Sequence, residues 1–122
     1  MLDLLCLSLV VYVEARGEPI DGQMLVAEVV INRTQADRYP DDVCGVVFEE
    51  DQFSGMDDLN VYQIITDPAW TTSMSVANDV LAGNGIGTTA THYHATHVDP
   101  YWSDHLTKLG QYGNHIFYRE DL

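Results

Sequence analysis

Positively charged residues are scarce in this sequence. Lysine and arginine together number five among 122 residues, against nineteen aspartates and glutamates, and the formal net charge is −14. Nucleic acids and anionic membranes attract proteins through positive charge. The composition therefore argues against both classes of partner.

Long hydrophobic runs are missing as well. The most apolar stretch, "MLDLLCLSLVVYV", covers about a dozen residues at the start, whereas a membrane-spanning helix needs about twenty. The stretch contains Asp3, and it has neither a positive flank nor a small-residue cleavage site, which argues against a signal peptide. We expect a first core helix, no membrane insertion and no export signal in this chain. Delivery to an extracellular substrate would then need a phage release partner, a longer precursor or another factor.

Cysteine is rare, with only Cys6 and Cys44 in the chain. Two cysteines cannot form the disulfide framework of a small secreted domain. Cys6 lies within the apolar first stretch, where a thiol is normally inert. We expect two buried thiols. A single disulfide is the alternative, and it requires an oxidising compartment.

The residues that are present suffice for one folded core. Hydrophobic residues make up 46% and charged residues 20% of the chain, both ordinary for a globular protein. The length predicts a single domain over residues 1–122. Its first helix is predicted over residues 2–16, apolar on nearly all sides, and Gly17 is expected to end it.

Two further helices have clear sequence boundaries. The second is predicted over residues 22–35, "GQMLVAEVVINRTQ", with Asp21 as its N-cap. The third is predicted to follow Asp67 as N-cap, with Pro68 at its first position and Gly83 closing it.

The remaining segments predict less regular structure. Residues 35–60 read as a long loop with one short apolar run at 46–48. After residue 84 the chain becomes rich in Thr, Tyr and His, and "HIFY" at 115–118 reads as a strand. We therefore predict an α+β fold that is mainly α, with a small β region in the C-terminal half.

A histidine cluster, His92, His94 and His97, suggests one kind of active site. Zinc needs three or four ligands in tight geometry, and a zinc-dependent amidase or peptidase would use these imidazoles. No H-E-x-x-H motif and no cysteine pair supports a metal. We favour the alternative, in which the histidines line a polar groove and bind substrate or one another.

Glu14 suggests a different active site, at the end of the apolar first helix. Partial burial there disfavours the charged carboxylate, so Glu14 is expected to have a raised pKa and to serve as a general acid. Glycoside cleavage needs such a donor. The alternative is an ordinary ion pair with Arg16 or Arg33. Glu18 is a weaker candidate for a second carboxylate, and Glu28, in mid-helix, is expected to be structural.

Several separated motifs resemble those of one known family. The segments "EARGE", "GQMLVAEVVINRT", "FS", "ATHYHATHVDPYW" and "GNHIFY" occur in the same order as in the SleB/CwlJ-type cell wall hydrolases. That family includes spore cortex-lytic enzymes and related bacterial and phage proteins. The match runs from about Val11 to Tyr118, nearly the whole chain.

The resemblance implies a lysozyme-like fold that cuts the glycan strands of peptidoglycan without a cofactor. The family's catalytic acid, the first residue of "EARGE", is Glu14 here, and Thr34 of "NRT" is implied in the cleft. The other residues implied or expected to bind substrate are Glu18, Asn32, Phe53, Ser54, His92, Tyr93, Tyr101, Trp102 and His115.

The resemblance also implies the reaction. Characterised members look like lytic transglycosylases, in which one carboxylate acts as acid and then as base to give a 1,6-anhydro product. Simple hydrolysis remains an alternative if Glu18 reaches the site, and a non-catalytic glycan-binding module is another. Peptidoglycan carries carboxylates, so a chain of charge −14 should bind it better when salt screens the repulsion.

Overall fold

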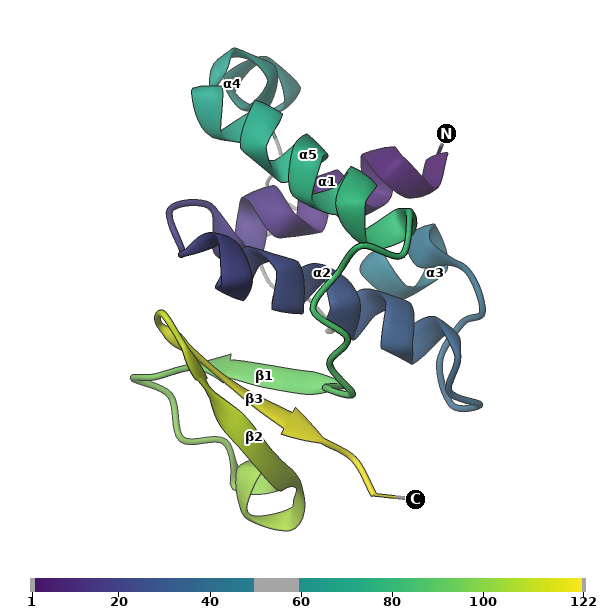
Figure 1. Cartoon of the computed structure of the whole chain (residues 1–122), viewed down its shortest axis with the longest axis vertical. Helices are drawn as coiled ribbons and strands as arrows, with labels where there is room; N and C mark the ends of the chain where they lie inside the picture. The colour runs from purple at the N-terminus through teal and green to yellow at the C-terminus, as the bar shows by residue number, and fades with distance from the viewer. Residues whose placement is uncertain (1, 50–59, 122) are drawn as a thin grey trace.

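A computed structural model describes residues 2–49 and 60–121 of the chain (Figure 1). Its helices and strands, in chain order, are α1 (Leu2–Ala15), α2 (Ile20–Thr34), α3 (Val43–Val47), α4 (Val61–Thr66), α5 (Pro68–Leu81), β1 (His92–Ala95), the 3-10 helix η2 (Tyr101–His105), β2 (Thr107–Tyr112) and β3 (His115–Arg119). The predicted α+β class, mainly α with β structure in the C-terminal half, is confirmed.

The end of α1 decides where Glu14 lies. Gly17 adopts φ +84°, and the N–H of Glu18 donates to the carbonyl of Ala15 at 3.0 Å. Only glycine takes this left-handed conformation without steric cost, so the helix ends at Ala15, a fully buried residue. Glu14 is thereby held in the final turn, at the rim of the core.

The helices form a packed layer around α1. α1 packs against α2, α3 and α5, and Figure 1 shows α2 lying between α1 and the sheet. The core of this layer is aliphatic: Leu7, Val10, Val11, Ala27, Val30, Val46, Val47 and Ala77 are at most 1% exposed. Burying this many aliphatic side chains supplies the main stabilisation of the layer.

A three-stranded antiparallel sheet packs on the other side of α2. The strand order is β1-β3-β2, and Tyr93 of β1 is paired with Phe117 of β3. Phe117 is 1% exposed and packs with Leu25, Val26 and Val29 of α2. Because side chains alternate along a strand, Tyr93 faces α2 and the flanking histidines of β1 face away.

Cys6 and Cys44 form a disulfide, with their Cα atoms 5.3 Å apart. The prediction of two buried thiols is therefore wrong. α1 packs directly on α3, which brings the two sulfurs together across 38 residues of sequence. Nothing in the spacing of two cysteines signals such a contact.

Two local predictions of helix position were also wrong. α2 begins at Ile20 after Pro19, so Asp21 lies inside the first turn and does not cap the helix. α3 is a short helix within residues 35–60, where a loop was predicted, and the side chain of Asp42 caps it. α4 follows that segment and is capped by the side chain of Asn60. By contrast, Asp67 caps α5 as predicted, accepting from the N–H of Ala69 at 2.9 Å.

Within the described residues, no helix is both long enough and apolar enough to cross a membrane.

Candidate active site

Glu14 meets the sheet through Tyr93. The Tyr93 hydroxyl donates to Oε1 of Glu14 at 2.9 Å, and it joins the last turn of α1 to strand β1. Arg16 instead donates to the carbonyl of Tyr12 at 3.0 Å, and Arg33 donates through Nε to the carbonyl of Thr91 at 2.8 Å. The observed partner of Glu14 is thus a neutral hydroxyl, and neither arginine forms the ion pair considered above.

The surroundings of Glu14 suit a proton donor. Burial raises the pKa of Glu14, and the hydrogen bond from Tyr93 offsets part of that rise. Burial and the adjacent Glu14 carboxyl raise the pKa of Tyr93 well above its usual value, so its hydroxyl keeps the proton that it donates to Glu14. Since Oε1 accepts this bond, the acidic proton of Glu14 belongs on Oε2.

The ring of Tyr93 is held by aromatic neighbours from β3. Its centroid lies 5.0 Å from that of His115, edge-on, and 5.6 Å from that of Phe117. His115 is 9% exposed, and burial lowers its pKa. A buried, neutral imidazole and a phenyl ring therefore fix the direction in which the Tyr93 hydroxyl points.

Glu18 is engaged elsewhere. Its carboxylate accepts from the backbone N–H of Asn114 at 2.7 Å and from the Asn114 side chain at 3.1 Å. The backbone hydrogen bond from Asn114 is the main reason that the pKa of Glu18 is lowered. Glu18 therefore ties the end of α1 to the β2–β3 turn, and its geometry favours a structural role.

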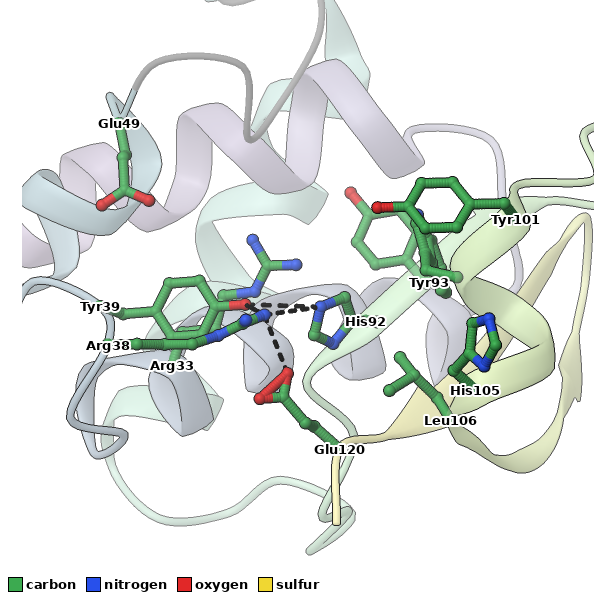
Figure 2. Close-up of a pocket in the computed structure, with 11 residues that line it drawn as sticks. Arg33, Arg38, Tyr39, Glu49, His92, Tyr93, Tyr101, His105, Leu106 and Glu120 are labelled. Carbon is green, nitrogen blue, oxygen red and sulfur yellow. Dashed lines mark hydrogen bonds and ion pairs between the residues drawn. The ribbon is translucent and has the colours of Figure 1, made fainter. Parts of the chain in front are cut away.

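A cavity of about 650 Å³ is lined in part by Tyr93 (Figure 2). Glu14 does not line this cavity, but Tyr93 does, and the Tyr93 hydroxyl is bonded to the Glu14 carboxyl. Three predicted residues share this wall with Tyr93: His92, Tyr101 and Trp102. Seven residues of the wall were not predicted as site residues, namely Arg33, Arg38, Tyr39, Glu49, His105, Leu106 and Glu120.

Hydrogen bonds fix the state of His92 in this cavity. Burial, with the nearby Arg33 and Arg38, lowers the pKa of His92 to about 4, so the ring is neutral at neutral pH. Its Nε2 lies 3.2 Å from Nη2 of Arg38, which can only donate. Nε2 is therefore the acceptor, and Nδ1–H donates to the Thr91 hydroxyl at 3.0 Å.

Three further predicted site residues lie in different surroundings. Trp102 packs between His92 and His94, at ring-centroid distances of 5.2 and 5.6 Å, and Tyr101 is 83% exposed at the cavity rim. Thr34 donates to the carbonyl of Ile31 at 2.6 Å, within its own helix.

Asn32 lies away from Glu14. Its amide donates to the carbonyls of Thr88 at 2.9 Å and Ala90 at 2.8 Å, and it lines a separate cavity of about 220 Å³. It therefore holds the segment that leads into β1. Phe53 and Ser54 lie outside the residues that the structure describes.

Comparison with known proteins places this architecture in a family. A profile described as Cell Wall Hydrolase matches residues 17–118. The chain belongs to this family. The resemblance to SleB/CwlJ-type cell wall hydrolases that the motifs indicated is thereby confirmed.

Curated relatives of this cell wall hydrolase are longer proteins. A spore cortex-lytic enzyme of Halalkalibacterium halodurans is 33% identical over 116 residues, which cover 94% of this chain and 34% of the relative. One from Oceanobacillus iheyensis is 31% identical over 115 residues, covering 94% and 41%. The chain thus spans well under half the length of these relatives.

Solved structures confirm the lysozyme-like fold of the cell wall hydrolase. The catalytic domain of the germination-specific lytic transglycosylase SleB from Bacillus anthracis superposes with a TM-score of 0.81 at 28% identity, covering 96% of this chain and 93% of that one. The catalytic domain of SleB from Bacillus cereus gives a TM-score of 0.79, also at 28% identity.

The histidine cluster of this hydrolase does not converge as a metal site would. His94 is bonded through both ring nitrogens, Nδ1 to the carbonyl of Ala95 and Nε2 to the hydroxyl of Tyr118, each at 2.8 Å. His97 is exposed in the turn after β1. In the part of the chain that the structure describes, no three potential ligands gather as a metal site requires. The geometry thus gives the zinc alternative no support.

Arg38, Tyr39 and Glu120 were missed because no local pattern marks them. Arg38 and Tyr39 lie in the irregular segment after α2, and Glu120 follows β3 near the end of the chain. The scarcity of basic residues was the one available signal. Two of only five, Arg33 and Arg38, lie five positions apart and line the same cavity.

Proposed function

We propose that this cell wall hydrolase cleaves peptidoglycan glycan strands between N-acetylmuramic acid and N-acetylglucosamine as a lytic transglycosylase. The observation that carries the proposal is the half-buried Glu14 carboxyl whose Oε1 is held by the Tyr93 hydroxyl at 2.9 Å. The printed description of the Bacillus anthracis relative as a lytic transglycosylase supports the reaction type. The family profile begins three residues after Glu14, so the role of Glu14 rests on its geometry.

In the first step, Glu14 acts as a general acid. Its raised pKa favours the protonated carboxyl, and Oε2–H donates the proton to the glycosidic oxygen. The bond from C1 of muramic acid to that oxygen breaks, and its electron pair stays with the leaving oxygen. An oxocarbenium-like centre develops at C1.

In the second step, the new Glu14 carboxylate acts as a general base. It takes the proton from the C6 hydroxyl of the same muramic acid, and that oxygen attacks C1 to close a 1,6-anhydro ring. The proton is back on Glu14 and no water is consumed. One carboxyl group therefore suffices, which agrees with a Glu18 that is bonded to Asn114.

The proposal is tested by mass spectrometry of the soluble fragments released from purified peptidoglycan. We expect disaccharide peptides one water lighter than the hydrolytic product, and we expect Glu14→Gln to release none of them. Glu18→Gln is the matched control, because it changes a carboxylate four residues away that should not take part in the chemistry. Its product masses should be unchanged.

Other products would contradict the proposal in distinct ways. Full-mass reducing fragments would show hydrolysis by water and require a second group to activate it. Free peptides with intact glycan, released equally by Glu14→Gln, would show that a different bond is cut by a different residue. Binding of glycan without release of any fragment would show a non-catalytic module.

A further inference from the structure

The cavity beside Tyr93 differs in charge from the rest of the molecule. Its wall contains two arginines, Arg33 and Arg38, and two glutamates, Glu49 and Glu120, whose charges cancel. The whole chain carries −14. This wall is therefore a locally neutral region within a strongly acidic protein, and neutrality at such a site affects which ligands it can accept.

Arg38 is fixed in place but still has donors to offer. Its Nη2 lies 2.8 Å from Glu120, 2.8 Å from the Tyr39 hydroxyl and 3.2 Å from Nε2 of His92. Its Nε and Nη1 make no hydrogen bond to any residue that the structure describes, and 54% of the side chain is exposed. A guanidinium held by one edge presents its other N–H groups without further loss of side-chain entropy.

Aromatic rings complete the wall. Tyr39 lies beneath the Arg38 guanidinium, whose carbon is 4.9 Å from the ring centroid. Trp102 and the exposed Tyr101 also line the cavity, and Figure 2 shows Tyr101 with the other lining side chains. Aromatic faces offer apolar contact to the C–H faces of a ring, while fixed polar groups orient its hydroxyls.

We propose that this cavity binds an uncharged N-acetylhexosamine part of the glycan strand, with the Arg38–Glu120 pair as its specificity-determining contact. The inference rests on the proposed function, because the strand would run from the cavity past Tyr93 to Glu14. Arg38 donates to ring hydroxyl or acetamido oxygens, Glu120 accepts from hydroxyls, and the aromatic rings contact the sugar faces.

The charge balance is what favours a neutral ligand over a carboxylate-bearing one. A carboxylate entering the cavity would be a third negative charge beside Glu49 and Glu120, and both glutamates would repel it. A sugar ring adds no charge and leaves the Arg38–Glu120 ion pair intact. The neutral His92 ring fits the same picture, because it accepts its hydrogen bond from Arg38 and adds no charge to the wall.

The test measures binding of tri-N-acetylchitotriose, a neutral oligomer of N-acetylglucosamine, by calorimetry to the Glu14→Gln protein. Adding Arg38→Gln should weaken binding about tenfold, the effect of losing a hydrogen bond to a charged group. Arg119→Gln is the matched control: Arg119 is similarly exposed and is paired with Asp121 at 2.8 Å, outside the cavity. It should leave the affinity unchanged.

A second variant distinguishes a loss of binding from a loss of folding. The Tyr101 side chain is 83% exposed, so Tyr101→Ala should leave the thermal midpoint unchanged and still weaken binding several-fold. Affinity for the neutral oligomer should also vary less than about twofold between low and high salt, because no net charge is brought together.

Two results would overturn the inference. One is equal affinity for the Arg38→Gln and Arg119→Gln proteins. The other is binding that requires carboxylate-bearing strands and weakens steeply with salt. Either result would leave the proposed function intact if the native enzyme still released anhydro fragments and Glu14→Gln did not. Cleavage by Glu14→Gln would instead refute the proposed function, whatever the oligomer affinities.

Discussion

The hydroxyl of Tyr93 donates to Oε1 of Glu14 across 79 residues of sequence. One partner ends a helix of the apolar layer and the other lies on the first strand of the sheet, with α2 packed between the two layers. Oε1 of Glu14 is thus bonded, and Oε2 has no hydrogen-bond partner among residues 2–49 and 60–121. A carboxyl group oriented in this way can transfer a proton in a defined direction.

Replacing Tyr93 with phenylalanine should change the pH dependence of cleavage. The Tyr93 hydrogen bond lowers the pKa of Glu14, so its loss should raise that pKa further. A general acid must be protonated, and its activity falls as pH rises through its pKa. The alkaline limb of the kcat/KM profile should therefore move to higher pH, while the maximum falls about tenfold because Glu14 is less well oriented.

Tyr12→Phe is the matched control for Tyr93→Phe. Tyr12 lies on the same helix and donates to Oδ2 of Asp67 at 2.6 Å, linking α1 to the N-terminus of α5. Losing this bond should cost about 1–2 kcal/mol of stability. The pH limb should stay where it is in native protein. The alkaline limb of the kcat/KM profile could instead stay in place in Tyr93→Phe, or shift equally in Tyr12→Phe. Either outcome would show that Tyr93 does not influence the proton transfer.

Local chemistry made part of this architecture predictable. Gly17 ends α1, Asp67 caps α5, and Glu14 is the one carboxyl in the last turn of an apolar helix, all of which depend on neighbours in sequence. The contacts that complete the site join distant segments. Tyr93 reaches Glu14 and Glu120 reaches Arg38 only because the sheet packs on α2, and single-sequence patterns carry no record of that packing.

The disulfide gives a prediction about redox conditions. Cys6–Cys44 closes 38 residues of chain, and cross-linking a loop of that size removes unfolded-state entropy worth about 4 kcal/mol. The Cys6→Ser, Cys44→Ser double variant should lose stability of that order in urea unfolding. Reductant should destabilise the native protein equally and leave the double variant unaffected. A native midpoint that is insensitive to reductant would mean that the bond is not formed in solution.

Chelators should not affect the reaction. Both ring nitrogens of His94 are hydrogen-bonded within the fold, and Nε2 of His92 is bonded to Arg38. We expect the same rate of fragment release before and after EDTA, and no gain from added Zn²⁺. His97→Ala, which removes the exposed member of the cluster, should also retain full activity. Loss with EDTA and recovery with Zn²⁺ would revive the zinc-dependent alternative.

Glu28 should hold the segment that leads into β1. Its carboxylate accepts from the backbone N–H groups of Ile86, Gly87 and Thr88 at 2.9, 2.7 and 3.2 Å. Glu28→Gln would set an amide NH₂ against these donors and should cost about 2–3 kcal/mol of stability. Asp21→Asn, an exposed change on the same helix, should cost less than about 0.5 kcal/mol. Equal urea midpoints for the two variants would refute the structural role.

The ionised carboxylate of Glu14 should destabilise the folded protein because it is partly buried. Replacing Glu14 with a neutral residue should restore that stability. Burial raises its pKa in the folded protein, so over the intermediate pH range the native state binds more protons than the unfolded chain, and stability falls as pH rises. Below the unfolded pKa both states are protonated and Glu14→Gln should change little. As pH rises through the folded pKa the variant should become progressively more stable than the native protein, and the difference should then level off.

Thermal midpoints of both proteins across this range, with Glu18→Gln alongside, test the sign. The pKa of Glu18 is lowered by Asn114, so its variant should lose stability above that pKa. A Glu14→Gln protein that is less stable at neutral pH would mean that the ionised carboxylate is favourably held, and Glu14 would then be poorly suited to donate a proton.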